Sequence, residues 1–260
     1  MWGAPGGESV EPRLSHRPAE LKDMSYEAVL FDLDNTLYPY APCNEAGKRA
    51  ALAALREHGY GMDRSTFDEL YATARREAKR EVRGTAASHE RFLYFKRALR
   101  IHADTHDAAA ALAVGEAYWD GFMTEMTPCD GVASTLAALQ EAGLAVAVVT
   151  NLTTHVQLEK LVRLGIDEYV DRLVTSEEVG REKPSAIPFT TALSALDLRP
   201  SEALVVGDNV EADIAGGNAV GTGTALFVAD GEAPADDELR AGQRPDHRLD
   251  TFGDVTEAAR

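Results

Sequence analysis

The spacing of hydrophobic positions changes along this chain, and the changes divide it into regions. A short apolar run at 28–33 ends in carboxylates, which is typical of a buried parallel strand whose carboxyl end opens onto a site. From about residue 44 to residue 125 the apolar positions recur at helical spacing, with few β-branched residues. This stretch predicts helices at 44–58, 64–82, 88–101 and 106–125.

Beyond Pro128 short apolar runs alternate with helical segments. This alternation predicts right-handed crossovers and an α/β fold, with a Rossmann-like, doubly wound parallel sheet. Ligands bind at the carboxyl ends of the strands in such sheets. Further strands are expected at 144–151, 171–176, 203–208, 224–228 and 247–250, and helices at 131–142, 153–164, 185–196 and 211–219.

These patterns predict a core domain with an inserted cap. Residues 1–24 are rich in Gly, Pro and charge without any sustained period, which indicates a flexible N-terminal arm. Residues 25–40 and 127–260 would form the α/β core domain. Residues 41–126 would form a helical bundle, inserted after the first strand as a cap above the carboxyl ends of the strands.

Composition excludes several classes of function. A formal net charge of −17 argues against nonspecific binding to nucleic acid or to an anionic membrane, since both need a basic surface. No apolar run approaches the roughly 18 to 20 residues that span a bilayer, and no secretory signal is present, so we expect a cytoplasmic protein. Cys43 and Cys129 form no CxxC pair, which argues against a disulfide framework or a thiolate zinc site.

The excess of acidic residues also suggests the salt concentration in which the protein works. Only six of the 26 basic residues are Lys, against 43 Asp and Glu. This balance suits a halophilic cytoplasm of very high salt, where screening tolerates self-repulsion. A high-GC genome that replaces Lys by Arg is the alternative explanation.

Two acids follow the first predicted strand. Asp32 and Asp34 stand two residues apart, so on an extended backbone their side chains point to the same side. That arrangement suits a nucleophile and a proton shuttle acting on one phosphorus, and Asp is also a ligand suited to Mg2+. Considered alone, the pair could equally be surface or capping acids.

Polar residues close the next strands as well. Thr150 and Asn151 offer a hydroxyl and backbone N–H groups that could hold phosphate oxygens, although Thr150 could instead cap the following helix. Lys183 precedes a helix and could balance both carboxylates and phosphate, although a lone loop lysine is usually solvated. Asp208 ends another strand after Gly207, with Asp213 five residues on, an order typical of metal sites.

Because all these residues fall at strand ends within one alternating pattern, we expect a single site. The matching segments are DLDNT at 32–36, Thr150, Lys183 and GDNVEAD at 207–213. In this order they resemble the four motifs of the haloacid dehalogenase superfamily, in the branch with a helical cap after the first motif. The resemblance covers residues from about 26 to 252.

The resemblance implies a role for the first two acids. Asp32 would attack phosphorus and ligate Mg2+. Asp34 would protonate the leaving oxygen, then activate water, and would ligate the metal through its backbone carbonyl. Dehalogenases of the superfamily resemble DxYGT at this motif and use no Mg2+, so Asp34 in place of the tyrosine favours phosphoryl transfer.

The resemblance implies roles for the other motifs too. Thr150 and Lys183 would bind the transferring phosphoryl group, with Asn151 beside them. Asp208 would ligate the metal directly, and Asp213 would be a further ligand or an anchor. Tyr38 and Tyr40 follow the nucleophile closely and are the residues expected to contact a leaving group.

Other signals are interpreted as structural. Residues 216–223 (GGNAVGTG) follow a helix, so we interpret them as a turn and not as a dinucleotide loop. His102 and His106 have the spacing of a metal pair, but residues between them resemble helix caps. The basic stretch Arg75–Arg83 is interleaved with Glu77 and Glu81, which indicates a solvated ion-pair face.

The predicted function is that of a Mg2+-dependent phosphatase that hydrolyses a small phosphate monoester through an aspartyl-phosphate. Its partner would be a small phosphorylated metabolite. One alternative is a phosphomutase acting on a sugar phosphate, and another is a catalytically silent binding protein. The silent alternative gives no reason for the pair Asp32 and Asp34. The identity of the substrate and the oligomeric state stay open.

Overall fold

All strands of the described chain join one parallel sheet. The computed structural model describes residues 26–228, 234, 235 and 237–260, so the predicted arm at 1–24 lies outside the described residues. Within them the sheet has six strands in the order β3-β2-β1-β4-β5-β6. This order is that of a doubly wound α/β fold, as predicted. The strands are β1 (Ala28–Phe31), β2 (Ala145–Thr150), β3 (Arg172–Thr175), β4 (Ala203–Gly207), β5 (Gly223–Phe227) and β6 (His247–Leu249).

The central strands are aligned so that their carboxyl ends meet at one edge. Phe31, the last residue of β1, pairs with Val148 of β2 and Val206 of β4. The N–H of Asp32 donates to the carbonyl of Val206 at 2.9 Å, which extends the pairing by one residue. The segments that follow these strands therefore emerge side by side, although they are distant in the sequence.

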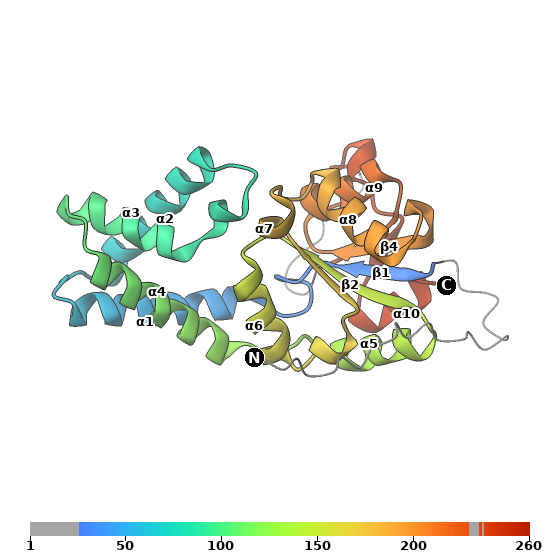
Figure 1. Ribbon diagram of the computed structural model, residues 1–260, viewed down its shortest axis with the longest axis horizontal. Coiled ribbons are helices and arrows are strands. Elements are labelled where there is room, and N and C mark those ends of the chain that lie inside the picture. Colours follow the sequence, from blue (N-terminus) through green and yellow to red (C-terminus); the bar gives the residue numbers. More distant parts are fainter. Residues whose placement is uncertain (1–25, 229–233, 236) are drawn as a thin grey trace, which may run out of the picture.

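Alternate side chains of β1 pack into two apolar layers, one on each face of the sheet. Val29 and Phe31 belong to the layer that includes residues of helices α5 (Val132–Glu141), α6 (Thr154–Leu164) and α10 (Val255–Ala258). Leu30 faces the other layer, which Phe189 of α8 (Ala186–Leu196) helps to form. Figure 1 shows α5 and α10 below the sheet and α8 and α9 (Gly216–Val220) above it. Both faces are covered, which explains why the strands are continuous apolar runs.

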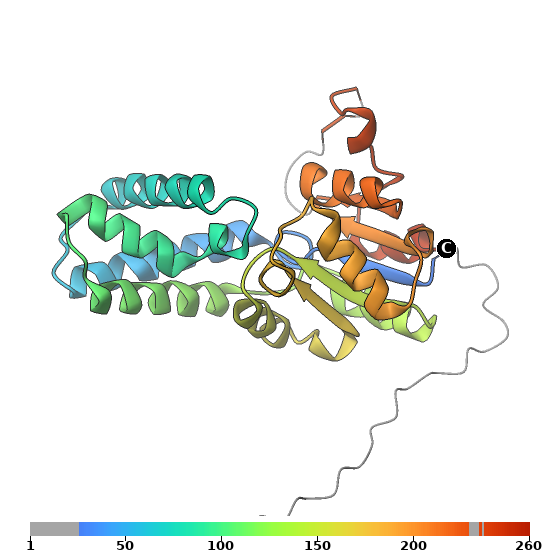
Figure 2. The ribbon, with the colours of Figure 1, turned by 45° about the horizontal axis from the view of Figure 1, so that its top comes forward.

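The helices from α1 (Tyr40–Glu57) to α4 (Ala108–Glu125) form a separate body beside the sheet (Figures 1 and 2). Helix α1 packs along α4, and α2 packs on α3. Aromatic rings fill the space between them, with Tyr118 stacked against Tyr71 and tilted against Phe95. The division into a core at 25–40 and 127–260 and a cap at 41–126 stays a prediction. The helices are α1 (Tyr40–Glu57), α2 (Arg64–Glu81), α3 (Arg91–Ala103) and α4 (Ala108–Glu125).

Short elements account for the differences from the predicted pattern. The helix expected at 88–101 begins only at Arg91, because Ala86–His89 forms a 3-10 turn. A one-turn helix, α7 (Ser176–Val179), was not expected, and Val210–Ala215 is π-helical. Among the described residues no helix is both long and apolar enough to cross a bilayer.

Candidate active site

A cavity of about 470 Å³ lies where the carboxyl ends of β1, β2 and β4 meet the helices of residues 41–126. A pocket of this size suits a small metabolite. It brings together most of the residues predicted from the strand ends. Its walls are formed by Asp32, Asp34, Asn35, Tyr40, Ala41, Arg75, His89, Arg91, Asn151, Leu152, Lys183, Asp208, Asn209, Ala212 and Asp213.

Asp32 is a nearly buried carboxylate with defined partners. Lys183 Nζ donates to its Oδ1 at 2.7 Å, and Thr36 Oγ1 donates to its Oδ2 at 3.2 Å. Burial, together with the charges of Asp213 and Asp208, raises the pKa of Asp32 to about 8, although Lys183 opposes the shift. A bound cation would favour the ionised form and reverse that shift.

Lys183 joins two carboxylates from segments that follow different strands. Its Nζ lies 2.7 Å from Asp32 Oδ1 and 2.7 Å from Asp213 Oδ1, and only 2% of its side chain is exposed. Burial opposes its charge, but the two carboxylates outweigh burial and raise the pKa of Lys183 above its ordinary value. Asn151 holds this loop, because its Oδ1 accepts from the N–H of Lys183 at 2.9 Å.

Three carboxylates converge beside Lys183. One carboxylate oxygen each of Asp32, Asp208 and Asp213 lies within 4.8 Å of the other two. Burial and the charge of Asp213 raise the pKa of Asp208 to about 6, although Asn35 Nδ2 donates to its Oδ2 at 2.8 Å. Three hard oxygen donors at this spacing fit a divalent cation such as Mg2+.

Gly207 is required by the placement of this cluster. A Cβ at this position would lie 2.3 Å from Asp213 Oδ2, which is closer than any real contact. The same oxygen accepts from the N–H of Asn209 at 3.0 Å. Only glycine therefore lets the carboxylate of Asp213 fold back over the end of β4.

Asp34 lies on the cavity wall but has a different environment. Lys160 Nζ and the Tyr38 hydroxyl both donate to Asp34 Oδ1, and Gln157 Nε2 donates to its Oδ2 at 3.3 Å. Burial raises the pKa of Asp34, but the charge and hydrogen bond of Lys160 outweigh it and lower the pKa. Its side chain is outside the three-carboxylate cluster, so a role as metal ligand through its backbone carbonyl stays a prediction.

Lys160 and Gln157 were not predicted from the sequence. Both lie on the buried face of α6, and the Lys160 side chain is 1% exposed. Its Nζ lies 5.6 Å from the ring centre of Tyr38 and 5.4 Å from that of Phe122. The available signal was their spacing, since two polar residues occupy positions of the helix that should face the core.

Two predicted site residues do not reach the cavity wall. Thr150 is buried, and its Oγ1 accepts from Gln157 Nε2 at 2.5 Å. Tyr38 has no exposed surface, and its hydroxyl holds Asp34, so its position does not fit the predicted contact with substrate. Tyr40 does line the cavity, as Asn151 does.

The cap side of the cavity contains residues that sequence reasoning missed. Arg91 and His89 line it together with Arg75, which had been assigned to a solvated face. His89 Nε2 lies 3.0 Å from Glu182 Oε1, and Ser88 Oγ donates to the same oxygen at 2.5 Å. Glu182 thus ties the segment before α3 to the loop of Lys183.

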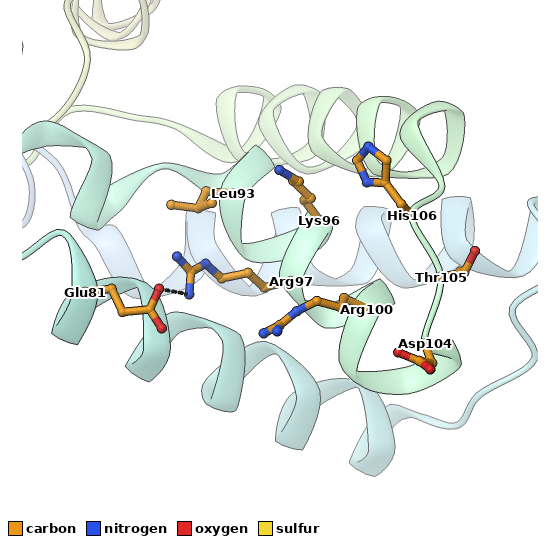
Figure 3. A pocket seen from close by; sticks show the side chains of 8 residues that line it. All are labelled: Glu81, Leu93, Lys96, Arg97, Arg100, Asp104, Thr105 and His106. Atoms are coloured by element: carbon orange, nitrogen blue, oxygen red, sulfur yellow. Dashed lines mark ion pairs between the residues drawn. The ribbon is translucent and has the colours of Figure 1, made fainter.

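A second cavity, of about 430 Å³, lies along α3 and the loop that follows it, beside Glu81 of α2, and its described lining residues include no carboxylate cluster (Figure 3). Arg97 crosses it to pair with Glu81 at 2.8 Å. His106 lines this cavity, whereas His102 packs edge-on against Tyr60, with ring centres 6.4 Å apart. The two histidines thus face different surroundings, which fits the structural interpretation.

The model of the haloacid dehalogenase-like hydrolases matches residues 26–221. The chain belongs to this family. The match spans β1 to α9, and it includes every predicted site residue. The resemblance inferred from the motifs is confirmed.

Relatives of this haloacid dehalogenase-like hydrolase are phosphatases. It is 53% identical over 233 residues to the ribulose-1,5-bisphosphate 5-phosphatase of Halopiger xanaduensis, covering 88% of the chain and 98% of the relative. It is 36% identical over 239 residues to the glyceraldehyde 3-phosphate phosphatase of Methanopyrus kandleri, covering 90% and 97%. The prediction of a hydrolase acting on phosphate esters is confirmed.

Solved structures confirm the fold. A phosphatase of the family from Thermococcus onnurineus has a TM-score of 0.69 at 21% identity, covering 89% of this chain and 97% of that one. A 2-haloacid dehalogenase from Pseudomonas syringae has a TM-score of 0.71 at 24% identity, covering 89% and 97%. Both phosphatases and dehalogenases thus share this architecture, and the side chains at the strand ends distinguish the chemistry.

Proposed function

We propose that this hydrolase removes a phosphoryl group from a small phosphorylated sugar, with Mg2+ and through an aspartyl-phosphate on Asp32. The observation that carries the proposal is the position of Asp32. Its carboxylate lies on the cavity wall, between the ammonium of Lys183 and the carboxylates of Asp208 and Asp213. Lys183 on one side, and a cation held by the carboxylates on the other, would neutralise charge at the nucleophile, which phosphoryl transfer needs most.

The first step would transfer the phosphoryl group to the protein. An oxygen of Asp32 attacks phosphorus, the bond from phosphorus to the sugar oxygen breaks, and that oxygen takes a proton from Asp34. Asp34 is ionised without substrate, since Lys160 lowers its pKa. A phosphate dianion in the cavity would raise that pKa again and favour the protonated form.

The second step would return the enzyme to its starting state. Water attacks phosphorus of the acyl phosphate and gives a proton to Asp34, and inorganic phosphate leaves as the Asp32 carboxylate re-forms. Mg2+, when bound, would supply positive charge to the transferring group. Asp32, Asp208 and Asp213 would hold it with the backbone carbonyl of Asp34, while Lys183 would bind phosphate oxygens. Thr150, to which the resemblance assigns the same role, does not line the cavity and accepts a hydrogen bond from Gln157.

The names of the relatives support sugar phosphates as the substrate class. The relative from Halopiger xanaduensis is named for a ketopentose bisphosphate, and the one from Methanopyrus kandleri for a triose phosphate. A cavity of about 470 Å³ has room for either. The greater identity of the first favours a bisphosphate.

Release of inorganic phosphate from a panel of phosphorylated sugars tests the proposal. We expect Mg2+-dependent release that Asp32→Asn lowers by about a thousandfold or more, because the nucleophile is lost. Asp130→Asn, at an exposed acid outside the cavity, is the matched control. An inactive panel would contradict the proposal, and isomerisation of a sugar phosphate with little phosphate release would favour a phosphomutase.

A further inference from the structure

The two sides of the active-site cavity carry opposite charge. The carboxylates of its wall, Asp32, Asp34, Asp208 and Asp213, all come from the segments that follow β1 and β4. On the cap side, the described residues that line the cavity include arginines and no carboxylate. Because the chain has a net charge of −17, a cavity wall with arginines and without carboxylates is unexpected.

Arg91 is the most unusual of these cap residues. It is only 5% exposed, and its guanidinium donates to neutral oxygens of Tyr40 (2.7 Å), Tyr118 (3.2 Å) and the backbone of His89. It makes no ion pair with any described carboxylate. Because a buried, unpaired charge is costly, an anion that joins Arg91 would be strongly favoured.

Aromatic rings hold Arg91 in place without neutralising it. Its guanidinium carbon lies 5.4 Å from the ring centre of Tyr94, 5.5 Å from Tyr118 and 5.3 Å from Trp119. Such contacts stabilise a cation by a modest amount while leaving its charge available. Arg91 is therefore fixed at the cavity wall with a full positive charge.

Arg75 and Lys79 add positive charge from α2. They are four residues apart and so lie on one face of the helix. Arg75 lines the cavity, and half-buried Lys79 has a pKa lowered first by burial and then by the charge of Arg75. Arg75 is exposed, as the interpretation of Arg75–Arg83 as a solvated face expects, but it also lines the cavity and makes no ion pair with a described carboxylate.

The carboxylates of the core do not pair with these arginines, because they form ion pairs with lysines. Lys183 contacts Asp32 and Asp213, and Lys160 contacts Asp34. His89 is likewise paired, with Glu182. Arg75 and Arg91 are left facing the cavity without a carboxylate partner among the described residues.

We propose that Arg75 and Arg91 bind a second anionic group of the substrate, so that this enzyme prefers a sugar bisphosphate to the corresponding monophosphate. The inference rests on the proposed function, because it places the transferred phosphoryl group at Asp32. A substrate held there would extend its far end toward the cap wall. Arginine suits this role, since its planar fork matches phosphate oxygens.

The test compares ribulose 1,5-bisphosphate with the same ketopentose carrying only the 5-phosphate, at one KCl concentration. We expect wild-type kcat/KM to favour the bisphosphate. Arg75→Gln should lower kcat/KM for the bisphosphate about tenfold or more, the scale of one lost charge-assisted hydrogen bond, and change the monophosphate by less than about twofold. Arg76→Gln, at the next exposed residue of α2 and outside the cavity, should leave both unchanged.

Arg91→Gln should lower the preference for the bisphosphate further. If this buried substitution prevents folding, the comparison with Arg75→Gln still tests the inference. Calorimetric binding of both sugars to Asp32→Asn, with and without Arg75→Gln, measures recognition without turnover. Equal wild-type kcat/KM values, or equal losses on both substrates, would overturn the inference and leave the proposed function standing. The opposite combination is also informative. If the bisphosphate binds more tightly and Arg75→Gln abolishes that preference, while wild type releases no phosphate, the inference is supported and the proposed function is overturned.

Discussion

Lys160 and Asp34 form an ion pair between helix α6 and the loop after β1, with the Lys160 side chain enclosed by protein. Its Nζ also lies over the rings of Tyr38, Trp119 and Phe122, and two of these belong to α4. One lysine thus holds the proposed acid/base and contacts the cap. Its charge outweighs burial and keeps Asp34 ionised.

Replacing Lys160 by Met should therefore change the pH dependence of the enzyme. Without the cation, burial would raise the pKa of Asp34, so the pH above which the base form is available would move upward. The second step needs Asp34 as a base, so we expect kcat at neutral pH to fall about tenfold or more. The measurement is kcat as a function of pH, with the exposed cap residue Lys96 replaced by Met as control. An unchanged acidic limb would show that Lys160 does not tune Asp34.

Mg2+ affinity should rise with pH. Burial and neighbouring acids raise the pKa of Asp32 to about 8 and that of Asp208 to about 6. Both carboxylates must be ionised to bind a cation, so protons compete with Mg2+ below these values. We expect the apparent Kd to fall by up to about tenfold for each pH unit between pH 6 and 8. Calorimetry at three pH values measures this, and a Kd independent of pH would contradict it.

Much of this site could be predicted because its residues follow buried strands. Asp32 and Asp208 stand directly after a strand and Thr150 ends one, each with an apolar run that is evident in the sequence, and in-register parallel pairing brings such positions together. Lys183 taken alone would be interpreted as a solvated lysine, and only its place in the order of motifs that resembles the family identified it. This part of the prediction depended on local patterns, on one rule of topology and on that resemblance.

The remainder depended on how the cap meets the core. Periodicity assigns Arg75 to a helix face but cannot say what that face contacts. The role proposed for Arg91 depends on the rings of Tyr118 and Trp119 on another helix and on the core site opposite. Tyr38 illustrates the converse. Its closeness to the nucleophile suggested a substrate contact, whereas tertiary packing turns its hydroxyl inward to Asp34.

Gly207→Ala should disrupt the carboxylate cluster while leaving the fold. The added Cβ would lie 2.3 Å from Asp213 Oδ2, so the carboxylate must move away from Lys183 and from the N–H of Asn209. We expect a destabilisation of about 1–3 kcal/mol and a loss of Mg2+-dependent activity of about tenfold or more. Thermal unfolding and kcat measure these, and Gly242→Ala, which meets nothing within 4 Å, is the control. Full activity in Gly207→Ala would show that Asp213 needs no fixed position.

Glu182→Ala should loosen the cap near the active site. Glu182 accepts from Ser88 and pairs with His89, and its backbone N–H donates to the carbonyl of Gly84 at 3.1 Å. Removing the carboxylate leaves only the backbone contact, so residues 84–89 should exchange amide hydrogens about tenfold faster. KM should rise because Arg91, whose guanidinium donates to the carbonyl of His89, is held less firmly. Hydrogen exchange and kinetics measure these effects.

The control for Glu182→Ala is Glu178→Ala, which removes an exposed acid from the neighbouring helix α7. It should change neither the exchange of 84–89 nor KM. Equal exchange in both variants would mean that Glu182 does not hold the cap.

Added KCl should stabilise the protein if its acidity is an adaptation to salt. With 43 acidic and 26 basic residues, repulsion destabilises the compact state, and screening shortens its range to about 3 Å at 1 M salt. Tm should therefore rise steeply up to about 1 M KCl, by more than in sucrose of equal osmolality, which stabilises by exclusion without screening. A Tm that is insensitive to KCl would favour the alternative, in which the scarcity of Lys reflects genome composition alone.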